Sequence, residues 1–507
     1  MDHDQIFKTI AVGIYFAAML AIGLWASRKN NDLDDYMLAG RKMSPGVAAL
    51  SAGASDMSGW LLMGLPGAVY AAGLVEAWIA IGLTVGAWLN WKFVAPRLRS
   101  YTEVSNNSIT VPSFLENRFR DRTRLLRIVS GLIILAFFTF YVSSGMVAGG
   151  KFFESSFGST YLFGMLLVAA ITVAYTLFGG FLGASLTDVV QGLMMLLALI
   201  AVPVATIVTM GGWDAIVDSV RAVDAASGEG VDHLSLFANA TWIGTISALA
   251  WGLGYFGQPH IIVRFMALRS AKEAAVGRRI GVAWMAICAL GAVMTAVVGL
   301  AYFQANPTTL DDPETVFLVL SQVLFHPLVA GFVLAAVLAA IMSTVSSQLI
   351  VCSSALVEDL YKIFGKEATP PRQMWMGRGG VLVVAVIAGL LALDPESSVL
   401  ELVGFAWAGF GAAFGPVILL SLFWKRFTAM GALAAMVVGA VVVAIWGNVS
   451  DEVWEGFALY EIVPGFLLAL IVGVLVSLVT FKHQPGVEAE FDEAASIAAG
   501  NEPTRAV

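Results

Sequence analysis

Long apolar segments alternate with short polar ones along most of the chain. Thirteen apolar segments can be delimited, near residues 9–27, 44–70, 76–94, 125–150, 161–179, 188–210, 240–260, 280–303, 325–352, 377–393, 402–424, 428–446 and 459–481. Most approach the roughly 20 residues that an α-helix needs to cross a hydrocarbon core about 30 Å thick. The pattern predicts an all-α polytopic membrane protein with 13 transmembrane helices.

Two of these segments differ from ordinary lipid-facing helices. The second contains SAGASDMSGWLLMGLPGAVYAAG, and the seventh contains ISALAWGLGYFGQPH. Glycine and proline at this density interrupt a helix and free backbone carbonyls. The two segments start five spans apart, so they enter from opposite faces, as two inverted five-helix repeats require. Interrupted helices at matching positions of such repeats indicate the central site of a transporter, and close helix packing through glycine is the alternative.

The distribution of basic residues predicts the orientation. Of the 28 Lys and Arg residues, all but Lys8, Lys151 and Arg221 fall in one set of alternate loops, which includes residues 264–279. Basic loops stay in the cytoplasm, so we expect the N-terminus outside and the C-terminus in the cytoplasm, in agreement with an odd number of spans.

The same pattern divides the chain into six regions. Residues 1–43 form an extra helix and a cytoplasmic loop, 44–210 the first repeat (helices 2–6) and 211–239 an extracellular loop. Residues 240–424 form the second repeat (helices 7–11), 425–481 the last two helices, and 482–507 a polar cytoplasmic tail. The tail is rich in Glu and Ala, and we expect it to be disordered.

Composition narrows the class of function. The chain has 507 residues, 59% hydrophobic and only 13% charged, with a mean hydropathy of +0.83. These values argue against a nucleic-acid-binding protein and a soluble enzyme. Two cysteines allow no disulfide framework, there is no phosphate-binding loop sequence, and the five histidines lack catalytic or metal-ligand spacing. We therefore do not expect this protein to be an enzyme.

Oxygen-bearing residues at membrane depth point to a cation. Asp56 costs at least ~2.5–3.5 kcal/mol there unless it meets a cation, a partner or water; neighbouring serine hydroxyls could instead satisfy it. Ser343 and Thr344 are adjacent, with the carbonyl of Ala340 one turn before them. Three such oxygens can converge on a small hard cation, although intramembrane hydroxyls often only bond back to their own helix.

Aromatic side chains gather in the same segments. Trp60, Tyr141, Trp251 and Tyr255, together with Pro259, could enclose the apolar part of a small solute, and plain packing is the alternative for each. Asp188 opens the sixth apolar segment within YTLFGGFLGASLTDVVQG. It is either a first-turn helix charge or a functional residue.

Four stretches of the chain resemble the sodium/solute symporter family, and the similarity extends over about residues 7–481. They are SAGASDMSGWLLMGLPGAV, WGLGYFGQPH, STVSSQLIVCSSA and the pattern YT..GG…TD..Q. The first two are similar to the proline-transporting branch of that family. The resemblance implies a LeuT-type core built from the inverted repeats. It also implies sodium-coupled uptake of L-proline by alternating access across a bacterial cytoplasmic membrane, with sodium as the coupling ion and no obligate protein partner.

The resemblance also implies roles for individual residues. Sodium would be bound by the carbonyls of Ala54, Met57 and Ala340 and the hydroxyls of Ser343 and Thr344, with Asp56 as the essential acidic residue. The proline pocket would comprise Ser58, Gly59, Trp60, Tyr141, Trp251, Tyr255 and Pro259. Arg41 would take part in ion coupling, and Asp188 is a second candidate for coupling.

Two other functions stay open. One is a symporter of the same fold for another amino acid, pantothenate or a sugar, although a sugar pocket should carry more Asn, Gln and Glu than these segments do. The other is a transporter-like sensor, for which residues 482–507 leave little room for a signalling domain.

Overall fold

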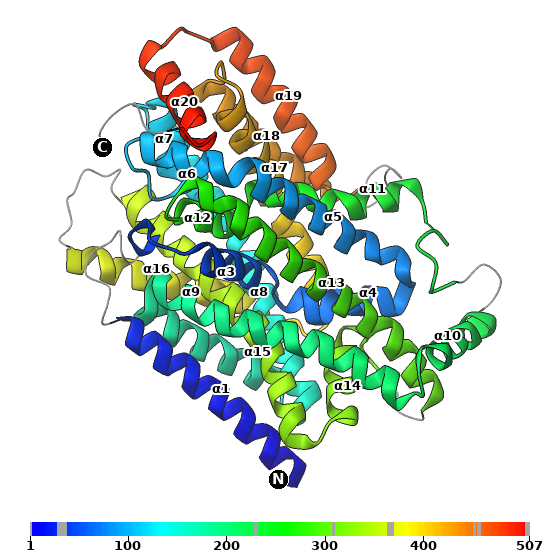
Figure 1. Ribbon diagram of the computed structural model, residues 1–507. Coiled ribbons are helices and arrows are strands. Elements are labelled where there is room, and N and C mark those ends of the chain that lie inside the picture. The colour runs from blue at the N-terminus through cyan, green and yellow to red at the C-terminus, as the bar shows by residue number, and fades with distance from the viewer. Residues whose placement is uncertain are drawn as a thin grey trace.

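The computed structural model describes residues 3–27, 38–227, 232–238, 240–306, 310–361, 370–449, 453 and 458–501. These residues are almost entirely helical (Figure 1), and the only β-bridge among them joins Met43 to Leu268. The first half comprises α1 (His3–Ser27), η1 (Ala39–Arg41), α3 (Pro45–Asp56), η2 (Trp60–Gly64), α4 (Leu65–Ala72), η3 (Leu74–Glu76), α5 (Ala77–Leu89), η4 (Asn90–Val94), α6 (Ala95–Val104), α7 (Val111–Phe119), α8 (Leu125–Phe157), α9 (Tyr161–Thr209) and α10 (Trp213–Ser227).

The second half begins with another interrupted helix. It comprises α11 (Trp242–Ala250), η5 (Trp251–Gly257), α12 (Pro259–Met266), η6 (Ala271–Glu273), α13 (Ala274–Ala305), η7 (Pro313–Thr315), α14 (Val316–Leu324), α15 (Pro327–Ser354), η8 (Ala355–Leu360), α16 (Pro370–Leu391), α17 (Val399–Phe423), α18 (Ala429–Trp446), α19 (Ile462–Thr480) and α20 (Pro485–Ala498).

Among the described residues, nine helices are long and apolar enough to cross a membrane. They are His3–Ala26, Leu74–Val104, Leu125–Phe157, Gly180–Thr209, Ala271–Ala305, Pro327–Val357, Val399–Phe423, Ala429–Trp446 and Ile462–Thr480. Each coincides with a predicted segment. The other four predicted segments, near 44–70, 161–179, 240–260 and 377–393, fold as shorter or interrupted helices. The helices therefore form a polytopic membrane bundle.

Both predicted interruptions are present. Helix α3 ends at Asp56, because Met57 leaves the helical region (φ −79°, ψ 81°), and the chain becomes helical again at η2. In the other segment, α11 passes into the tighter turns of η5 and then into extended backbone at Gln258 (φ −78°, ψ 107°). Pro259 starts α12, a position where its missing N–H costs no hydrogen bond. Each break exposes backbone groups inside the bundle.

Helix α9 also contains a break, at Gly180 (φ 59°, ψ −164°). Glycine adopts this conformation without the strain that a Cβ would bring. The predicted fifth segment ends at this point. The following residues, which the sequence pattern leaves as a connection between segments, are helical and continue directly into the sixth.

The centre of the bundle is formed by α15 and α17, which are buried along most of their length. Helix α15 packs against α1, α8 and α9, and α17 packs against η5, α8, α18 and α19. Figure 1 shows α1 at one edge of the molecule and α18 and α19 at the opposite edge. The two interrupted helices meet these central helices, because α3 contacts α15 and η5 contacts α17.

Helices α10 and α14 are among those that lie outside the thirteen predicted segments. Helix α10 occupies part of the expected loop 211–239 and packs against α13, while α14 precedes α15 and contacts α13, α9 and α8. The apolar run of α14 is only 9 residues long, too short for a span. Residues 213–227 and 316–324 are therefore structured connections.

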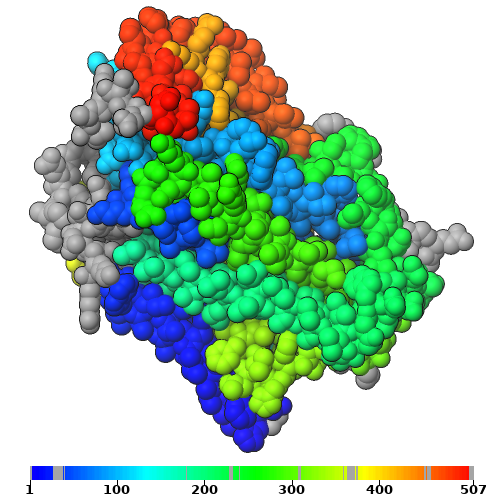
Figure 2. Space-filling model, viewed as in Figure 1, coloured from blue at the N-terminus to red at the C-terminus, as the bar shows by residue number. Residues whose placement is uncertain are grey.

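The expectation of a disordered tail is wrong for residues 485–498, which form α20 and pack on α6. Val487 and Ala494 are buried, and the Phe491 ring lies edge-on to Tyr101, with the ring centroids 6.0 Å apart. Figure 2 shows this helix on the surface, at the end of the molecule formed with α18 and α19. Its composition is polar, but a few apolar residues at helical spacing suffice once a surface is available to bury them.

Candidate functional site

Helices α3 and α15 meet through oxygen atoms. The hydroxyl of Ser343 donates to the carbonyl oxygens of Ala54 (2.7 Å) and Ala340 (3.1 Å), and that of Thr344 donates to Ala340 O (3.2 Å). All four residues are buried. Because α3 ends at Asp56, the carbonyl of Ala54 lies in the last turn, where intrahelical donors run out. The result is a compact group of hydroxyl and carbonyl oxygens contributed by two helices.

Met57 lies in the break beside this group. Its N–H donates to Gly53 O (2.9 Å) and closes the last turn of α3, while its ψ of 81° turns the following peptide out of the helical direction. The side chain is fully buried. Of the five residues expected to bind sodium through a carbonyl or hydroxyl oxygen, the hydrogen bonds join four, and Met57 lies three residues after one of them, Ala54.

Asp56 connects the two interrupted helices. Its Oδ2 accepts a short hydrogen bond from the hydroxyl of Tyr255, which lies on η5. Its backbone oxygen accepts from Trp60 Nε1 (3.0 Å) and from the hydroxyl of Tyr141 on α8 (3.3 Å). Its Oδ1 is buried and has no hydrogen-bond partner. A buried carboxylate with an open oxygen is costly unless a positive charge or a proton accompanies it.

The alternative explanation for Asp56, satisfaction by neighbouring serine hydroxyls, is not supported. Ser55 donates to Ala52 O (3.0 Å), and Ser51 donates to the carboxylate of Asp188 (2.7 Å). Ser58 Oγ lies 3.4 Å from the backbone N of Trp60, from which it accepts a hydrogen bond.

The expected pocket aromatics form a continuous cluster around the two breaks. The centroids of Trp60 and Trp251 lie 6.4 Å apart, Trp251 stacks on Tyr460 at 5.2 Å, and Tyr255 lies edge-on to Trp407 at 5.1 Å. The indole N–H of Trp407 donates to the carbonyl of Trp251 (2.7 Å). Sequence reasoning missed Trp407 and Tyr460, because they lie in segments that showed no helix break.

Close approach of backbone to side chains explains two glycines of these breaks. A Cβ at Gly254 would overlap the Trp407 ring, and a Cβ at Gly59 would lie 2.9 Å from Ala148 Cβ on α8. Ser58 and Gly59 both lie in the break, between α3 and η2, and Gly59 packs against α8. Pro259 lines a narrow cleft with Val263.

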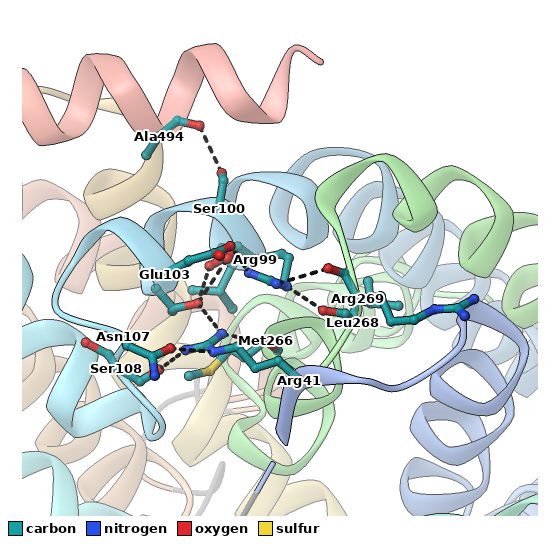
Figure 3. Close-up of polar contacts among 12 residues, drawn as sticks. Arg41, Arg99, Ser100, Glu103, Asn107, Ser108, Met266, Leu268, Arg269 and Ala494 are labelled. Carbon is teal, nitrogen blue, oxygen red and sulfur yellow. Dashed lines mark hydrogen bonds and ion pairs between the residues drawn. The ribbon is translucent and has the colours of Figure 1, made fainter. Parts of the chain in front are cut away.

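Arg41 lies at the far end of α12. Its guanidinium donates to Met266 O (2.8 Å), to Ser108 O (2.6 Å) and to Asn107 Oδ1 (2.8 Å) (Figure 3). The bond to Met266 satisfies a carbonyl at the C-terminus of α12, where a positive charge is favoured. Arg41 therefore fixes the C-terminal end of α12, about two helical turns from Pro259 at its start.

Asp188 is buried and lies well inside α9, so the interpretation as a first-turn helix charge is wrong. Its carboxylate pairs with Arg264 (3.1 Å), which is 1% exposed and lies on α12. The charge count placed Arg264 among the loop residues 264–279, and the structure corrects this. His260 and Arg264 are four residues apart, one helical turn, and this spacing could have indicated that the helix continues to Arg264.

The fold and the buried oxygen group define the protein as a membrane transporter. Interrupted helices that present backbone oxygens and a carboxylate to the middle of a bundle are the hallmark of secondary transport sites. A family model described as "Sodium:solute symporter family" matches residues 36–439. The chain belongs to this family.

Relatives with assigned names cover nearly the whole chain. It is 54% identical over 476 residues to "High-affinity proline transporter PutP" of Bacillus subtilis, covering 94% of this chain and 98% of the relative. It is 52% identical over 472 residues to "Osmoregulated proline transporter OpuE" of the same organism, covering 93% and 94%. It is 49% identical over 496 residues to "Sodium/proline symporter" of Staphylococcus aureus, covering 96% of each.

Solved structures share the fold. A sodium-coupled sialic acid symporter in a substrate-bound, outward-open state aligns with a TM-score of 0.77 and 20% identity, over 94% of this chain and 99% of that one. Mhp1, a transporter of the nucleobase-cation-symport-1 family, aligns with a TM-score of 0.52 and 14% identity, over 90% and 98%. At these identities the comparison supports the fold, which is of the LeuT type.

Proposed function

We propose that the protein takes up L-proline together with sodium by alternating access, across the cytoplasmic membrane of a bacterium. The observation that carries the proposal is the hydrogen bond from Ser343 to Ala54, which brings the hydroxyls of α15 onto the broken end of α3 beside Asp56. The names of three relatives that are 49–54% identical over most of the chain support proline as the solute.

Sodium is the transported ion in this proposal. It would be bound by the carbonyl oxygens of Ala54, Met57 and Ala340 and by the hydroxyls of Ser343 and Thr344, a set that suits a hard cation. A hydroxyl has lone pairs as well as a hydrogen. The hydrogens that now point at Ala54 O and Ala340 O can turn away and leave the same oxygens facing the ion. Asp56 would supply the negative charge.

Proline would bind between the two breaks. Its ring is apolar, and Trp60, Trp251, Tyr255 and Tyr141 offer the surface to enclose it. Its charged ends would meet the backbone at Ser58 and Gly59. Because the Tyr255 hydroxyl contacts Asp56, a solute that presses on Tyr255 also acts on the carboxylate beside the ion. Pro259, at the start of α12, would close the pocket.

Arg41 and Asp188 act on this site through α12 in the proposal. Arg41 contacts the C-terminal end of that helix at Met266 O, and Asp188 pairs with Arg264 in its last turn. Any rocking of α12 that opens one side of the site must break or carry these contacts, which would couple ion binding to solute release.

The proposed topology has thirteen spans. The nine long helices supply nine, and the broken pair α3–α4, the first part of α9, the α11–α12 segment and α16 supply four more. The two inverted repeats occupy residues 44–210 and 240–424, and the charge distribution directs the N-terminus outside and α20 to the cytoplasm. The proposal needs no partner protein.

Electrogenic accumulation tests the proposal. Proline carries no net charge near neutral pH, so a cycle with one sodium ion moves one charge inward. That charge gains ~2.3 kcal/mol across 100 mV, which supports roughly 50-fold accumulation at ~1.4 kcal/mol per tenfold. In proteoliposomes with equal sodium on both sides, a valinomycin potassium-diffusion potential should drive labelled proline uphill. Internal proline that never exceeds the external level would contradict coupled transport. Competition by other amino acids, pantothenate and sugars tests the solute.

A further inference from the structure

A buried ion pair lies beside the proposed sodium site. The NH2 nitrogen of Arg264 lies 3.1 Å from Asp188 Oδ2 and 2.7 Å from Ser347 Oγ, and its Nε lies 3.0 Å from Ser51 Oγ. Ser51 in turn donates to Asp188 Oδ2 (2.7 Å). The guanidinium therefore contacts one carboxylate oxygen and two hydroxyls, besides the backbone oxygen of His260 on its own helix, and all four side chains are buried.

This cluster repeats the sodium group one turn further along the same two helices. Ser347 follows Ser343 by four residues on α15, and Ser51 precedes Ala54 by three on α3. Residues three or four apart share a helix face and are separated by about 5.4 Å along the axis. Each group thus contains oxygens from α3 and α15. The buried carboxylate of Asp188 contacts one group through Ser51, and the buried Asp56 follows Ala54 of the other group by two residues.

One oxygen of the Asp188 carboxylate remains available to a cation. Its Oδ1 is buried and has no hydrogen-bond partner, and the same is true of Gln191 Oε1, on the next turn of α9. Removing one partner of a buried ion pair leaves an uncompensated charge that must be neutralised. With the guanidinium gone, the cluster would present a carboxylate and two hydroxyls, the ligand types that a hard monovalent cation accepts.

We propose that the guanidinium of Arg264 occupies the position of a second cation, tethered to α12, so that the protein binds one sodium ion where an otherwise identical site would bind two. The inference rests on the proposed sodium coupling. Replacing Arg264 by a neutral residue should convert the Asp188 cluster into a sodium site.

Sodium binding to purified protein tests this directly. The number of ²²Na⁺ ions bound per chain at saturation should be one in the wild type and two in Arg264→Gln. It should return to one in Asp188→Asn/Arg264→Gln, where the carboxylate that needs a cation is also gone. Wild-type protein that binds no sodium would overturn the proposed function. One sodium in both wild type and Arg264→Gln would overturn only this inference.

A matched control is Arg99, another buried arginine near α12. Its guanidinium donates to Leu268 O (2.5 Å) and Arg269 O (3.1 Å) and pairs with the half-exposed Glu103 (Figure 3). Arg99→Gln should leave the count at one, because it uncovers no buried carboxylate. A count of two in Arg99→Gln would contradict the assignment to Asp188.

The amount of folded variant in the membrane gives a second test of the proposed role of Arg264. If Arg264→Gln does not reach the membrane, its misfolding is ascribed to the uncompensated charge of Asp188, and the double variant should restore folded protein. Recovery in the double variant supports the tethered-cation role. Absence of both variants from the membrane overturns it, because Arg264 would then be needed for packing irrespective of charge.

Discussion

Alanine at Ser343 and at Thr344 should weaken sodium binding alike but affect stability differently. Both hydroxyls belong to the proposed ion site, yet only Ser343 bonds to another helix, at Ala54 O (2.7 Å). Thr344 bonds only to Ala340 O on its own helix (3.2 Å). The structure thus separates an ion ligand that also joins two helices from one that does not.

The expected magnitudes follow from these contacts. Losing one oxygen contact to a desolvated charge costs roughly 1.5–3 kcal/mol, so half-saturating sodium should rise about 10- to 150-fold in each variant. Proline affinity at saturating sodium should change far less. Without sodium, Ser343→Ala also loses the hydrogen bond to Ala54, worth about 0.5–1.5 kcal/mol. Thr344→Ala loses only a bond back to its own helix and should unfold near the wild-type temperature.

Two measurements check this prediction. Initial rates of proline uptake into proteoliposomes, as a function of external sodium, give the ion requirement, and thermal unfolding in sodium-free detergent gives the stability. Ser321→Ala is a matched control, because this buried serine bonds only to Phe317 O on its own helix α14 (2.7 Å). An unchanged sodium requirement in both variants would refute the ion site. Equal destabilisation of the two would refute the assigned difference in packing.

Three further predictions concern the carboxylate, the packing and the tail. Asp56→Asn should nearly abolish sodium-driven uptake, while Asp56→Glu should retain some. A milder effect of Asn than of Glu, at matched expression, would show that the charge is not used. Tyr255→Phe should raise the KM for proline at least ~10-fold, because the hydrogen bond to the Asp56 carboxylate is lost. Gly257→Ala should lower the amount of folded protein in the membrane, because its Cβ would overlap the backbone of α17, whereas Gly13→Ala, with nothing within 4 Å, should not. Phe491→Ala should expose α20 to limited proteolysis, because the ring packs on Tyr101; a tail that stays resistant would show that other contacts hold it.

The sequence alone was sufficient for features that depend on local chemistry. The apolar segments that coincide with the nine long helices follow from the cost of exposing polar groups to lipid, which each segment meets by itself. The breaks at Met57 and Gln258 follow from serine, glycine and proline within a few residues of them. The oxygen-bearing residues Ser343 and Thr344 stood out because they are adjacent, with the carbonyl of Ala340 one helical turn before them. These are short-range properties, and the prediction of a site was based on them.

The tertiary structure decided which of these residues meet. The bonds from Tyr255 to Asp56 and from Arg264 to Asp188 join residues 199 and 76 positions apart. No local pattern encodes such a pairing, because it depends on how the interrupted helices pack on α9 and α15. Arg264 looked like a loop charge because its hydropathy is that of a surface residue, and only the opposing carboxylate makes its burial tolerable. Helix α20 looked disordered because its few apolar residues stabilise a helix only when α6 is there to cover them.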